Sequence, residues 1–114
     1  MILSKEQYQE YVVNVADMQI FDGRGRGVDV YICRKCGKMK LTRYKDKGVT
    51  PFVMPCFCGG DMVHEHTVAQ TSPICAIETV SDWVRPTYEQ FLKQPEGVQM
   101  HVMNGGLVLE EELI

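Results

Sequence analysis

The chain of 114 residues is long enough for one domain, and its apolar fraction of 45% is ordinary for a folded protein. No stretch approaches the roughly 20 apolar residues of a transmembrane helix, and residues 1–5 contain no apolar segment of secretory length, so we expect a cytoplasmic protein without a membrane partner. The net charge of −3 is unevenly distributed. Residues 23–50 hold nine Lys/Arg against two Asp, a charge of +7, whereas the remainder holds three Lys/Arg against thirteen acids, a charge of −10.

The first predicted element is an amphipathic helix over residues 4–18. Ser4 and Gln7 have the spacing of a capping box, in which each side chain satisfies a backbone N–H of the other residue. Apolar residues then recur at the spacing of one helical face, at Tyr8, Tyr11, Val12, Val15 and Met18. We expect this face to cover a core. The glycine-rich segment 23–27 ends the helical region, and it does not have the strand-before, helix-after context of a phosphate-binding loop.

Residues 28–68 are predicted to form a small antiparallel sheet. Residues 28–32 alternate in character, which places Val28, Val30 and Ile32 on one face of a strand. Further strands are expected over residues 39–44, 49–54 and 61–68, with Pro51 and Pro55 at an edge or at strand ends. A sheet of three or four strands buries little apolar surface, so we expect a metal ion to hold its ends together.

Four of the five cysteines fall in two close pairs, Cys33 with Cys36 and Cys56 with Cys58. Two such pairs present four thiolates to one tetrahedral ion, so the spacing predicts a Zn²⁺ site of the zinc-ribbon type. Only one residue separates the second pair, where two are commoner, and this leaves His64, His66 or Cys75 open as a replacement ligand. Free thiols or disulfides are the alternative, and disulfides require an oxidising compartment. Cys75 lies in an apolar run and is otherwise expected to be a buried core thiol.

Residues 83–114 are predicted to form a C-terminal helical region. Proline suits the first turn of a helix, so one helix is expected to begin at Pro86. Its inward face would be formed by Tyr88, Phe91 and Leu92. A second short helix is expected over residues 95–103, followed by a strand or extended tail over residues 107–109 and by three solvated glutamates.

Two resemblances accompany these patterns. The segment from Cys33 to Cys58 resembles zinc ribbons, a class found in transcription, replication and RNA proteins and in small adaptor modules. Trp83, Arg85-Pro86, Phe91 and the run from His101 to Leu107 resemble the C-terminal part of short phage-encoded proteins. The second resemblance implies a small regulator that acts in the host cytoplasm, and neither resemblance implies an activity.

The sequence favours a non-enzymatic function. Four thiolates close the coordination shell of zinc, whereas a catalytic zinc needs an open position. The His64-Glu65-His66 run does not fit a metalloprotease, whose two histidines are four residues apart on a helix. No other catalytic motif is present.

Two kinds of partner are consistent with the sequence. Cations and aromatic residues together are typical of single-strand or RNA contact, which predicts that nucleic acid or a nucleoprotein complex binds a basic ribbon face. That face would be formed by Arg24, Arg26, Arg34, Lys35, Lys38, Lys40, Arg43, Lys45 and Lys47, interleaved with Tyr31 and Tyr44 and with Phe52 and Phe57. The alternative is a protein-docking inhibitor or adaptor that acts on a host protein without touching nucleic acid. A zinc tetrathiolate carries −2, so Arg34, Lys35 and Lys38 could simply balance the metal centre, whereas Arg24, Arg26, Lys45 and Lys47 lie away from it.

Overall fold

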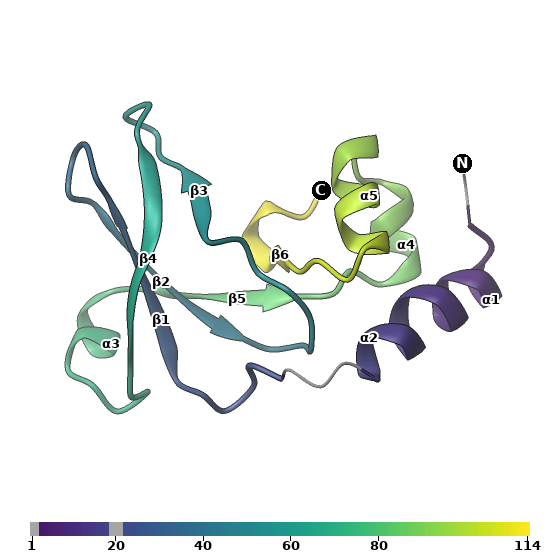
Figure 1. Cartoon of the computed structure of the whole chain (residues 1–114), viewed down its shortest axis with the longest axis horizontal. Helices are drawn as coiled ribbons and strands as arrows, with labels where there is room; N and C mark the ends of the chain where they lie inside the picture. The colour runs from purple at the N-terminus through teal and green to yellow at the C-terminus, as the bar shows by residue number, and fades with distance from the viewer. Residues whose placement is uncertain (1–2, 19–21) are drawn as a thin grey trace.

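A curled sheet of six strands forms the centre of the protein in a computed structural model, which describes residues 3–18 and 22–114 (Figure 1). Residues 1–2 and 19–21, which belong to the predicted single domain over residues 1–114, lie outside the described ranges. The strand order is β3-β4-β1-β2-β5-β6. In chain order the strands are β1 (Val28–Cys33), β2 (Met39–Tyr44), β3 (Val53–Pro55), β4 (Asp61–Val68), β5 (Val80–Val84) and β6 (Val108–Leu109).

The four strands predicted over residues 28–68 pair antiparallel, but they belong to a larger, mixed sheet of six strands. β1 and β2 form one antiparallel hairpin, and β3 and β4 form a second one. The two hairpins are joined by antiparallel pairing of β1 with β4. β5 then lies parallel to β2, with Leu41 opposite Val80 and Tyr44 opposite Trp83. The connection from β4 to β5 crosses the sheet through the short helix α3 (Ile74–Ile77), which allows the parallel pairing. β6 completes the sheet antiparallel to β5.

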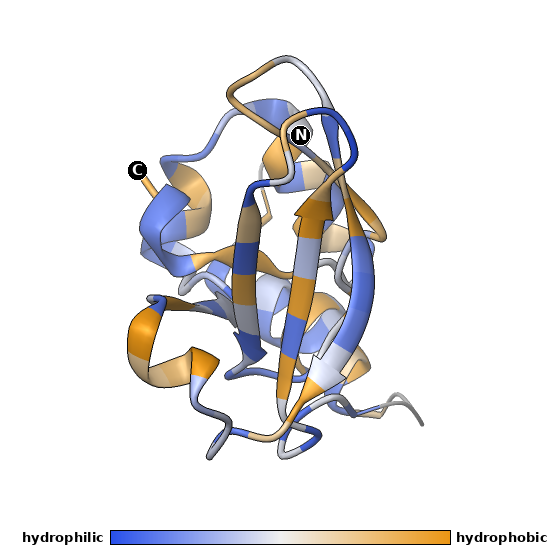
Figure 2. Ribbon diagram, turned by 90° about the vertical axis from the view of Figure 1, so that its left-hand side faces the viewer, coloured by the Kyte–Doolittle hydropathy of each residue, from blue (hydrophilic) through white to orange (hydrophobic). Residues whose placement is uncertain are grey.

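Two of the predicted strands match the observed bounds, and one is shorter. Residues 39–44 and 61–68 form β2 and β4 as expected, and alternation of apolar and polar residues along the strands is visible in Figure 2. The third predicted strand, residues 49–54, begins only at Val53, because Pro51 lies outside it and its carbonyl accepts a hydrogen bond from the Tyr31 hydroxyl at 2.6 Å. Pro55 ends this edge strand, as predicted.

The N-terminal helix forms as predicted, although it is not a regular α-helix throughout. α1 (Lys5–Tyr8), a π-helical segment η1 (Gln9–Asn14) and α2 (Val15–Asp17) follow one another without a break in helical backbone angles. The capping box is present, with the Gln7 N–H donating to Ser4 Oγ at 3.2 Å and the Ser4 N–H donating to Gln7 Oε1 at 2.9 Å. Tyr8 and Val12 are buried, whereas Tyr11 and Met18 of the predicted stripe are exposed.

The C-terminal region contains the two predicted helices, α4 (Tyr88–Leu92) and α5 (Glu96–Met103), followed by β6 and a 3₁₀ turn η2 (Glu110–Glu112). α4 begins at Tyr88, two residues after the predicted start at Pro86, because Thr87 is its N-cap and forms a second capping box with Gln90. Phe91 faces inward as predicted, but Leu92 is exposed. Phe91 packs with Tyr8, Val12 and Val102, which joins the N-terminal helix to the C-terminal helices in one apolar cluster.

The two faces of the central strand β1 are both covered. Val28 and Val30 pack with Leu41 beneath α3. Cys75 of α3 packs against this cluster as a half-buried residue, so the prediction of a buried core thiol holds only in part. Tyr31 lies on the other face, in a cluster with Trp83. This second cluster forms the concave side of the curled sheet.

Candidate metal centre and adjoining groove

Cys33, Cys36, Cys56 and Cys58 converge at one end of the sheet, and their sulfur atoms all lie within 4.8 Å of one another. The Cys33 and Cys58 sulfurs are 3.4 Å apart, and the Cys36 and Cys56 sulfurs are 3.7 Å apart. A tetrahedral ion with metal–sulfur bonds of about 2.3 Å places its ligands roughly 3.8 Å apart, so these sulfurs are close to the corners of such a tetrahedron. This group of four cysteines could hold a metal ion.

Two tight turns aim the sulfurs. The turn after β1 places the N–H groups of Lys35 and Cys36 on the Cys33 sulfur, each at 3.4 Å. The turn after β3 places the Gly60 N–H on the Cys58 sulfur, also at 3.4 Å. Gly37 at φ 77° and Gly59 at φ 87° supply the left-handed backbone that these turns require. Backbone donors that point at sulfur favour the thiolate form, which is the form that binds metal.

The same hydrogen bonds decide which thiol ionises first. The backbone N–H of Cys36, assisted by that of Lys35, lowers the pKa of the Cys33 thiol to about 6. The Gly60 N–H acts in the same direction on Cys58, but the neighbouring Cys33 sulfur and burial outweigh it and raise the pKa of Cys58 to about 12. A cation bound among these close sulfurs would replace their protons and relieve the mutual repulsion of the thiolates.

Gly60 is required by the packing around the cluster. A Cβ atom at this position would lie 2.6 Å from Lys35 Cβ, 3.0 Å from the Cys33 sulfur and 3.3 Å from the Cys58 sulfur. No side chain larger than hydrogen fits there without displacing a sulfur. The one-residue spacing between Cys56 and Cys58 is thus accommodated by the Gly59-Gly60 pair, with the Gly59 N–H donating to the Cys56 carbonyl at 3.0 Å.

The alternative ligands that the sequence left open lie elsewhere. His64 Nε2 is 3.0 Å from the buried carboxylate of Asp29, and His66 projects from the same strand as an exposed side chain. The Cys75 sulfur lies 3.7 Å from the Ala69 carbonyl on the far side of the sheet beneath α3. Across residues 3–18 and 22–114, the four cysteines are the one group of this kind that could hold a metal ion.

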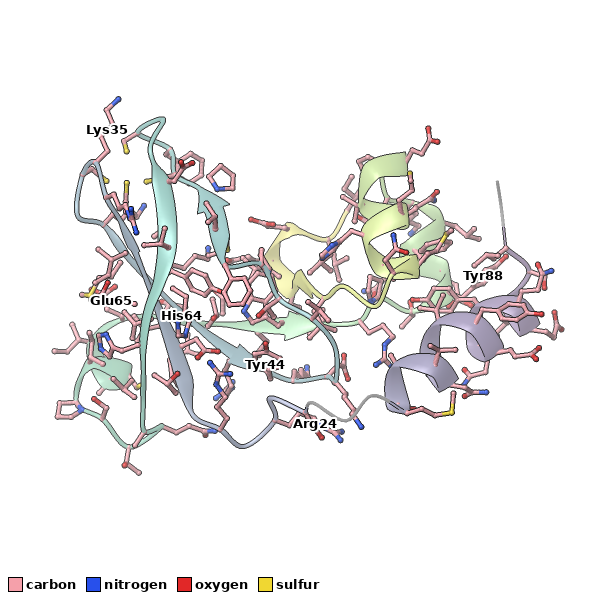
Figure 3. The ribbon with its side chains drawn as sticks, in the orientation of Figure 1. Arg24, Lys35, Tyr44, His64, Glu65 and Tyr88 are labelled. Carbon is pink, nitrogen blue, oxygen red and sulfur yellow. The ribbon has the colours of Figure 1, made fainter. Side chains whose placement is uncertain are left out.

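The basic segment does not form one continuous cationic face. Acidic residues, most of them outside the segment, pair with most of its cations, as in the contacts of Arg24 with Asp22 and of Arg43 with Asp82. Lys40 and Lys45 pair with Glu111 and Glu110 in the same way, Arg26 contacts Asp29, and Lys47 donates to the Asp17 carbonyl. Figure 3 shows Arg24 and Lys35 at separate ends of the sheet. The cations left exposed beside the cysteines are Arg34, Lys35 and Lys38.

The two tyrosines predicted to stack on bases are core residues. Tyr31 and Tyr44 are 2% and 8% exposed, and their hydroxyls are bound to the Pro51 carbonyl and to Thr50. Their role as a nucleic-acid contact is therefore wrong. Phe57 instead projects fully into solvent between Cys56 and Cys58, with Lys38 Nζ 5.4 Å from its ring centre. The strand alternation could not reveal this, because Phe57 lies outside the strands. It belongs to one of the two adjoining cysteine-bearing turns, residues 33–37 and 56–60, which together are called the metal turn.

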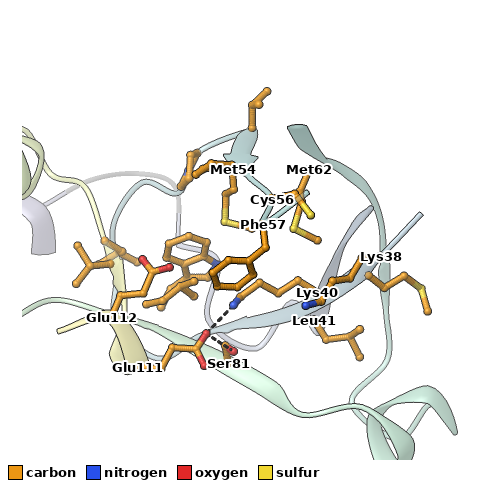
Figure 4. Close-up of a pocket in the computed structure, with 18 of the residues that line it drawn as sticks. Lys38, Lys40, Leu41, Met54, Cys56, Phe57, Met62, Ser81, Glu111 and Glu112 are labelled. Carbon is orange, nitrogen blue, oxygen red and sulfur yellow. Dashed lines mark hydrogen bonds and ion pairs between the residues drawn. The ribbon is translucent and has the colours of Figure 1, made fainter. Parts of the chain in front are cut away.

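An apolar groove of about 690 Å³ adjoins the metal turn (Figure 4). The edge strands β3 and β6 both contribute to it, because the curl of the sheet brings the two edges to the same cavity. Trp83 and Leu107 are buried residues of its lining, whereas Phe57, Met39 and Val53 are exposed residues at its rim. The indole Nε1 of Trp83 is buried without a hydrogen-bond partner among the described residues. Sequence reasoning missed this groove completely.

His101, Gly106 and Leu107 have a structural role where the chain leaves α5. The His101 ring lies against Gly106, where a Cβ would come within 2.2 Å of it, and His101 Nε2 is 2.9 Å from the Leu107 carbonyl. The Gly106 N–H donates to the His101 carbonyl at 2.8 Å. These residues turn the chain from α5 into β6 and place Leu107 in the core.

No helix within the described ranges is both long and apolar enough to cross a membrane. No protein-family model matches the chain, and neither a curated protein nor a solved structure matches it. The function must therefore be argued from the four-cysteine centre and the groove.

Proposed function

We propose that this protein is a non-enzymatic, zinc-stabilised regulator that docks on a partner protein through the groove between β3, β6 and the metal turn. The groove carries this proposal. Its exposed apolar rim of Phe57, Met39 and Val53 is costly to leave in water, and soluble proteins keep such contiguous patches mainly where they bind. The cavity of about 690 Å³ is large enough for several side chains of a partner.

Zinc is the metal that this donor set favours. Four thiolates in two turns suit a tetrahedral ion without redox chemistry, and such closed sites stabilise folds rather than catalyse reactions. Cys33, Cys36, Cys56 and Cys58 would hold the ion, and the ion would supply a rigid join between the β1–β2 turn and the β3–β4 turn. Because Cys56 and Phe57 also line the groove, this join fixes one of its walls.

The ion pairs made by the cations of residues 23–50 favour docking on a protein, and not binding of nucleic acid, as the main function. The cations away from the metal, Arg24, Arg26 and Lys45, are engaged by carboxylates, so they offer few free charges to phosphates. Arg34, Lys35 and Lys38 remain, and a zinc tetrathiolate of charge −2 would offset most of their +3. The steep electrostatic attraction on which non-specific nucleic-acid binding depends is therefore weak here.

One observation favours nucleic acid as a second candidate. Phe57 is fully exposed at the metal turn, and the cations Arg34, Lys35 and Lys38 lie around the same tip. An exposed aromatic ring beside cations can stack on a single-stranded base, at about 1–3 kcal/mol per base. A titration of labelled single-stranded DNA and RNA at two salt concentrations tests this candidate. Binding that weakens in the Arg34→Gln/Lys35→Gln variant would support it.

The docking proposal is tested with two phenylalanines that differ in position. Phe57 and Phe52 are both exposed, but only Phe57 lines the groove. A partner recovered with the zinc-loaded protein should be lost with Phe57→Ser and retained with Phe52→Ser. Trp83 is the single tryptophan, so occupation of the groove by the purified partner should also change the intrinsic fluorescence. Equal retention by both variants, with unchanged fluorescence, would contradict docking in the groove.

A further inference from the structure

We propose that the groove takes an extended peptide segment of the partner, which lies along the free edge of β3 and carries an apolar residue next to a lysine or arginine. This inference rests on the docking function proposed above and names the chemistry of the occupant. It follows from three features of the groove: an unpaired strand edge, an unpartnered donor and acidic side chains on one border.

The free edge of β3 is the first feature. The His64 N–H donates to the Phe52 carbonyl at 3.1 Å, and the Cys56 N–H donates to the Gly60 carbonyl at 2.9 Å. Backbone groups on an antiparallel strand face its partner at every second residue, so Phe52, Met54 and Cys56 face β4. The N–H and carbonyl of Val53 and the carbonyl of Pro55 consequently face away from β4.

β3 is an edge strand, and no other strand of the sheet pairs with that free edge. Val53 and Pro55 also line the groove, and Figure 1 shows β3 on the side of β4 that looks toward β6. An extended peptide is the ligand whose backbone matches such an edge. Pro55 lacks an N–H, so pairing is expected to be short and centred on Val53.

The unpartnered donor is the second feature. Trp83 is 3% exposed, lines the groove, and leaves its Nε1–H without an acceptor among the residues described. A buried donor without an acceptor is destabilising because it has lost its hydrogen bond to water, and a peptide carbonyl is an acceptor that an extended occupant brings to the groove. The apolar surface around this donor, including Leu41 and Leu107, then suits an aliphatic or aromatic side chain of the peptide.

Charge is the third feature. Three glutamates, Glu78, Glu111 and Glu112, border the groove, against Lys38 and Lys40. Lys40 is already neutralised by Glu111 at 2.6 Å, and Lys38 lies over the Phe57 ring. Glu78 and Glu112 are exposed and make no ion pair within the described part of the chain. A cationic residue beside the apolar anchor of the peptide would complement them.

The experiment selects peptides from a displayed library of random decapeptides against the zinc-loaded full chain. Selected peptides should share an extended pattern with an apolar anchor and a nearby lysine or arginine, and a synthetic, terminally capped copy should change the fluorescence of Trp83. Glu78→Gln/Glu112→Gln should weaken that peptide about threefold, since exposed ion pairs are worth a few tenths of a kcal/mol each. Val53→Pro removes the Val53 N–H, a donor that β4 does not use, and should weaken binding of the peptide about fivefold. Val53→Ala keeps the N–H and is the matched control.

The outcomes separate the inference from the docking function. Peptides that bind the groove but are helical or acidic, or that bind Val53→Pro and Val53→Ala equally, would overturn the extended cationic occupant and leave docking intact. A concentration-dependent dimer that Val53→Pro abolishes would also overturn it, because the edge would then be covered by a second copy. If no selected peptide binds in the groove and the partner also binds Phe57→Ser normally, both proposals fail.

Discussion

The metal turn and the helical end of this protein are held together by different interactions. At the helical end, Tyr8, Val12, Phe91 and Val102 bury their side chains in one cluster. Burial of four such side chains contributes about 6–12 kcal/mol relative to exposure, as an upper estimate. At the metal turn only Cys33 is buried, while Cys36 and Cys58 are exposed.

The metal turn therefore lacks an apolar core of its own. A structural zinc ion contributes about 10–16 kcal/mol to the folding of small zinc-binding peptides, comparable with or larger than the helical cluster. Where coordination supplies the stability, side chains of the same turn are released from packing. A zinc ion bound by the four cysteines would therefore allow Phe57 to be fully exposed to solvent between two ligand positions, whereas no residue of the helical cluster is fully exposed.

Loss of a metal ligand should have the largest effect. Cys36→Ser removes one of four thiolates, so the protein should lose its bound zinc, expected at about one ion per chain, and the metal turn should unfold. Cys75→Ser changes a half-buried thiol outside the centre and should cost no more than about 1 kcal/mol. Metal analysis and thermal unfolding of both variants measure the difference. Equal losses of melting temperature would argue that Cys75 belongs to the site.

A cavity at the helical end should have the next largest effect. Phe91 is 1% exposed, and Phe91→Ala is expected to lower the free energy of unfolding by about 3–5 kcal/mol. The zinc content at low temperature should stay at one ion per chain, since no ligand is touched. The neighbouring Leu92→Ala, at an exposed position of the same helix, is the control and should change stability little. Loss of zinc together with stability would show that the two ends are not independently held.

Gly60→Ala is expected to have an intermediate effect at the metal turn. The added Cβ would meet Lys35 Cβ at 2.6 Å and the Cys33 sulfur at 3.0 Å, so the turn must shift, at a cost of about 1–3 kcal/mol. Zinc affinity, measured by competition with a chromophoric chelator, should fall. Gly97→Ala is the matched control, because its Cβ meets nothing within 4 Å and alanine favours the helix that holds it. Unchanged affinity in Gly60→Ala would mean that the sulfurs have room to move.

The four-cysteine cluster could be predicted from sequence because its information is local. Cys33 and Cys36 lie in one turn, Cys56 and Cys58 lie in another, and each spacing indicates a shared ligand. The strands 39–44 and 61–68 were predictable from their alternation for the same reason. What the spacing could not decide was the choice between Cys56 or Cys58 and the histidines, which depends on how the two turns meet in space.

The features that sequence reasoning missed depend on distant residues. β5 was not predicted, because its first three residues are only half-buried and its parallel partner lies almost 40 positions earlier in the chain. The charge of residues 23–50 looked free because Asp82, Glu110 and Glu111, which pair with three of its cations, come from the C-terminal half. β1 is buried on both faces, so alternation could not show that Tyr31 is a core residue.

The smallest predicted effect concerns Asp29, which belongs to neither end and is the second residue of β1. Its carboxylate is 3% exposed, and one oxygen accepts hydrogen bonds from Thr67 Oγ1 at 2.7 Å and Arg26 Nη2 at 2.7 Å and lies 3.0 Å from His64 Nε2. Burial acts to raise the pKa of Asp29, but the hydrogen bonds from Thr67, His64 and Arg26 outweigh it, so the pKa is lowered.

A lowered carboxyl pKa stabilises the folded state wherever the group is ionised in both states. The contribution of Asp29 is therefore fully present above the unfolded pKa of about 3.9 and is lost as the pH falls through the lower, folded value. Asp29→Asn should lower the free energy of unfolding by about 1–2 kcal/mol at pH 7, since the charge-assisted hydrogen bonds are weakened. The difference from the wild type should shrink below pH 4, because the wild-type carboxyl is protonated first in the unfolded state and, at lower pH, in the folded state as well. Urea unfolding between pH 7 and pH 3 measures both curves, with the exposed Asp61→Asn as control. Parallel curves for wild type and Asp29→Asn over that whole range would show that the hydrogen-bonded carboxylate does not stabilise the sheet through its charge.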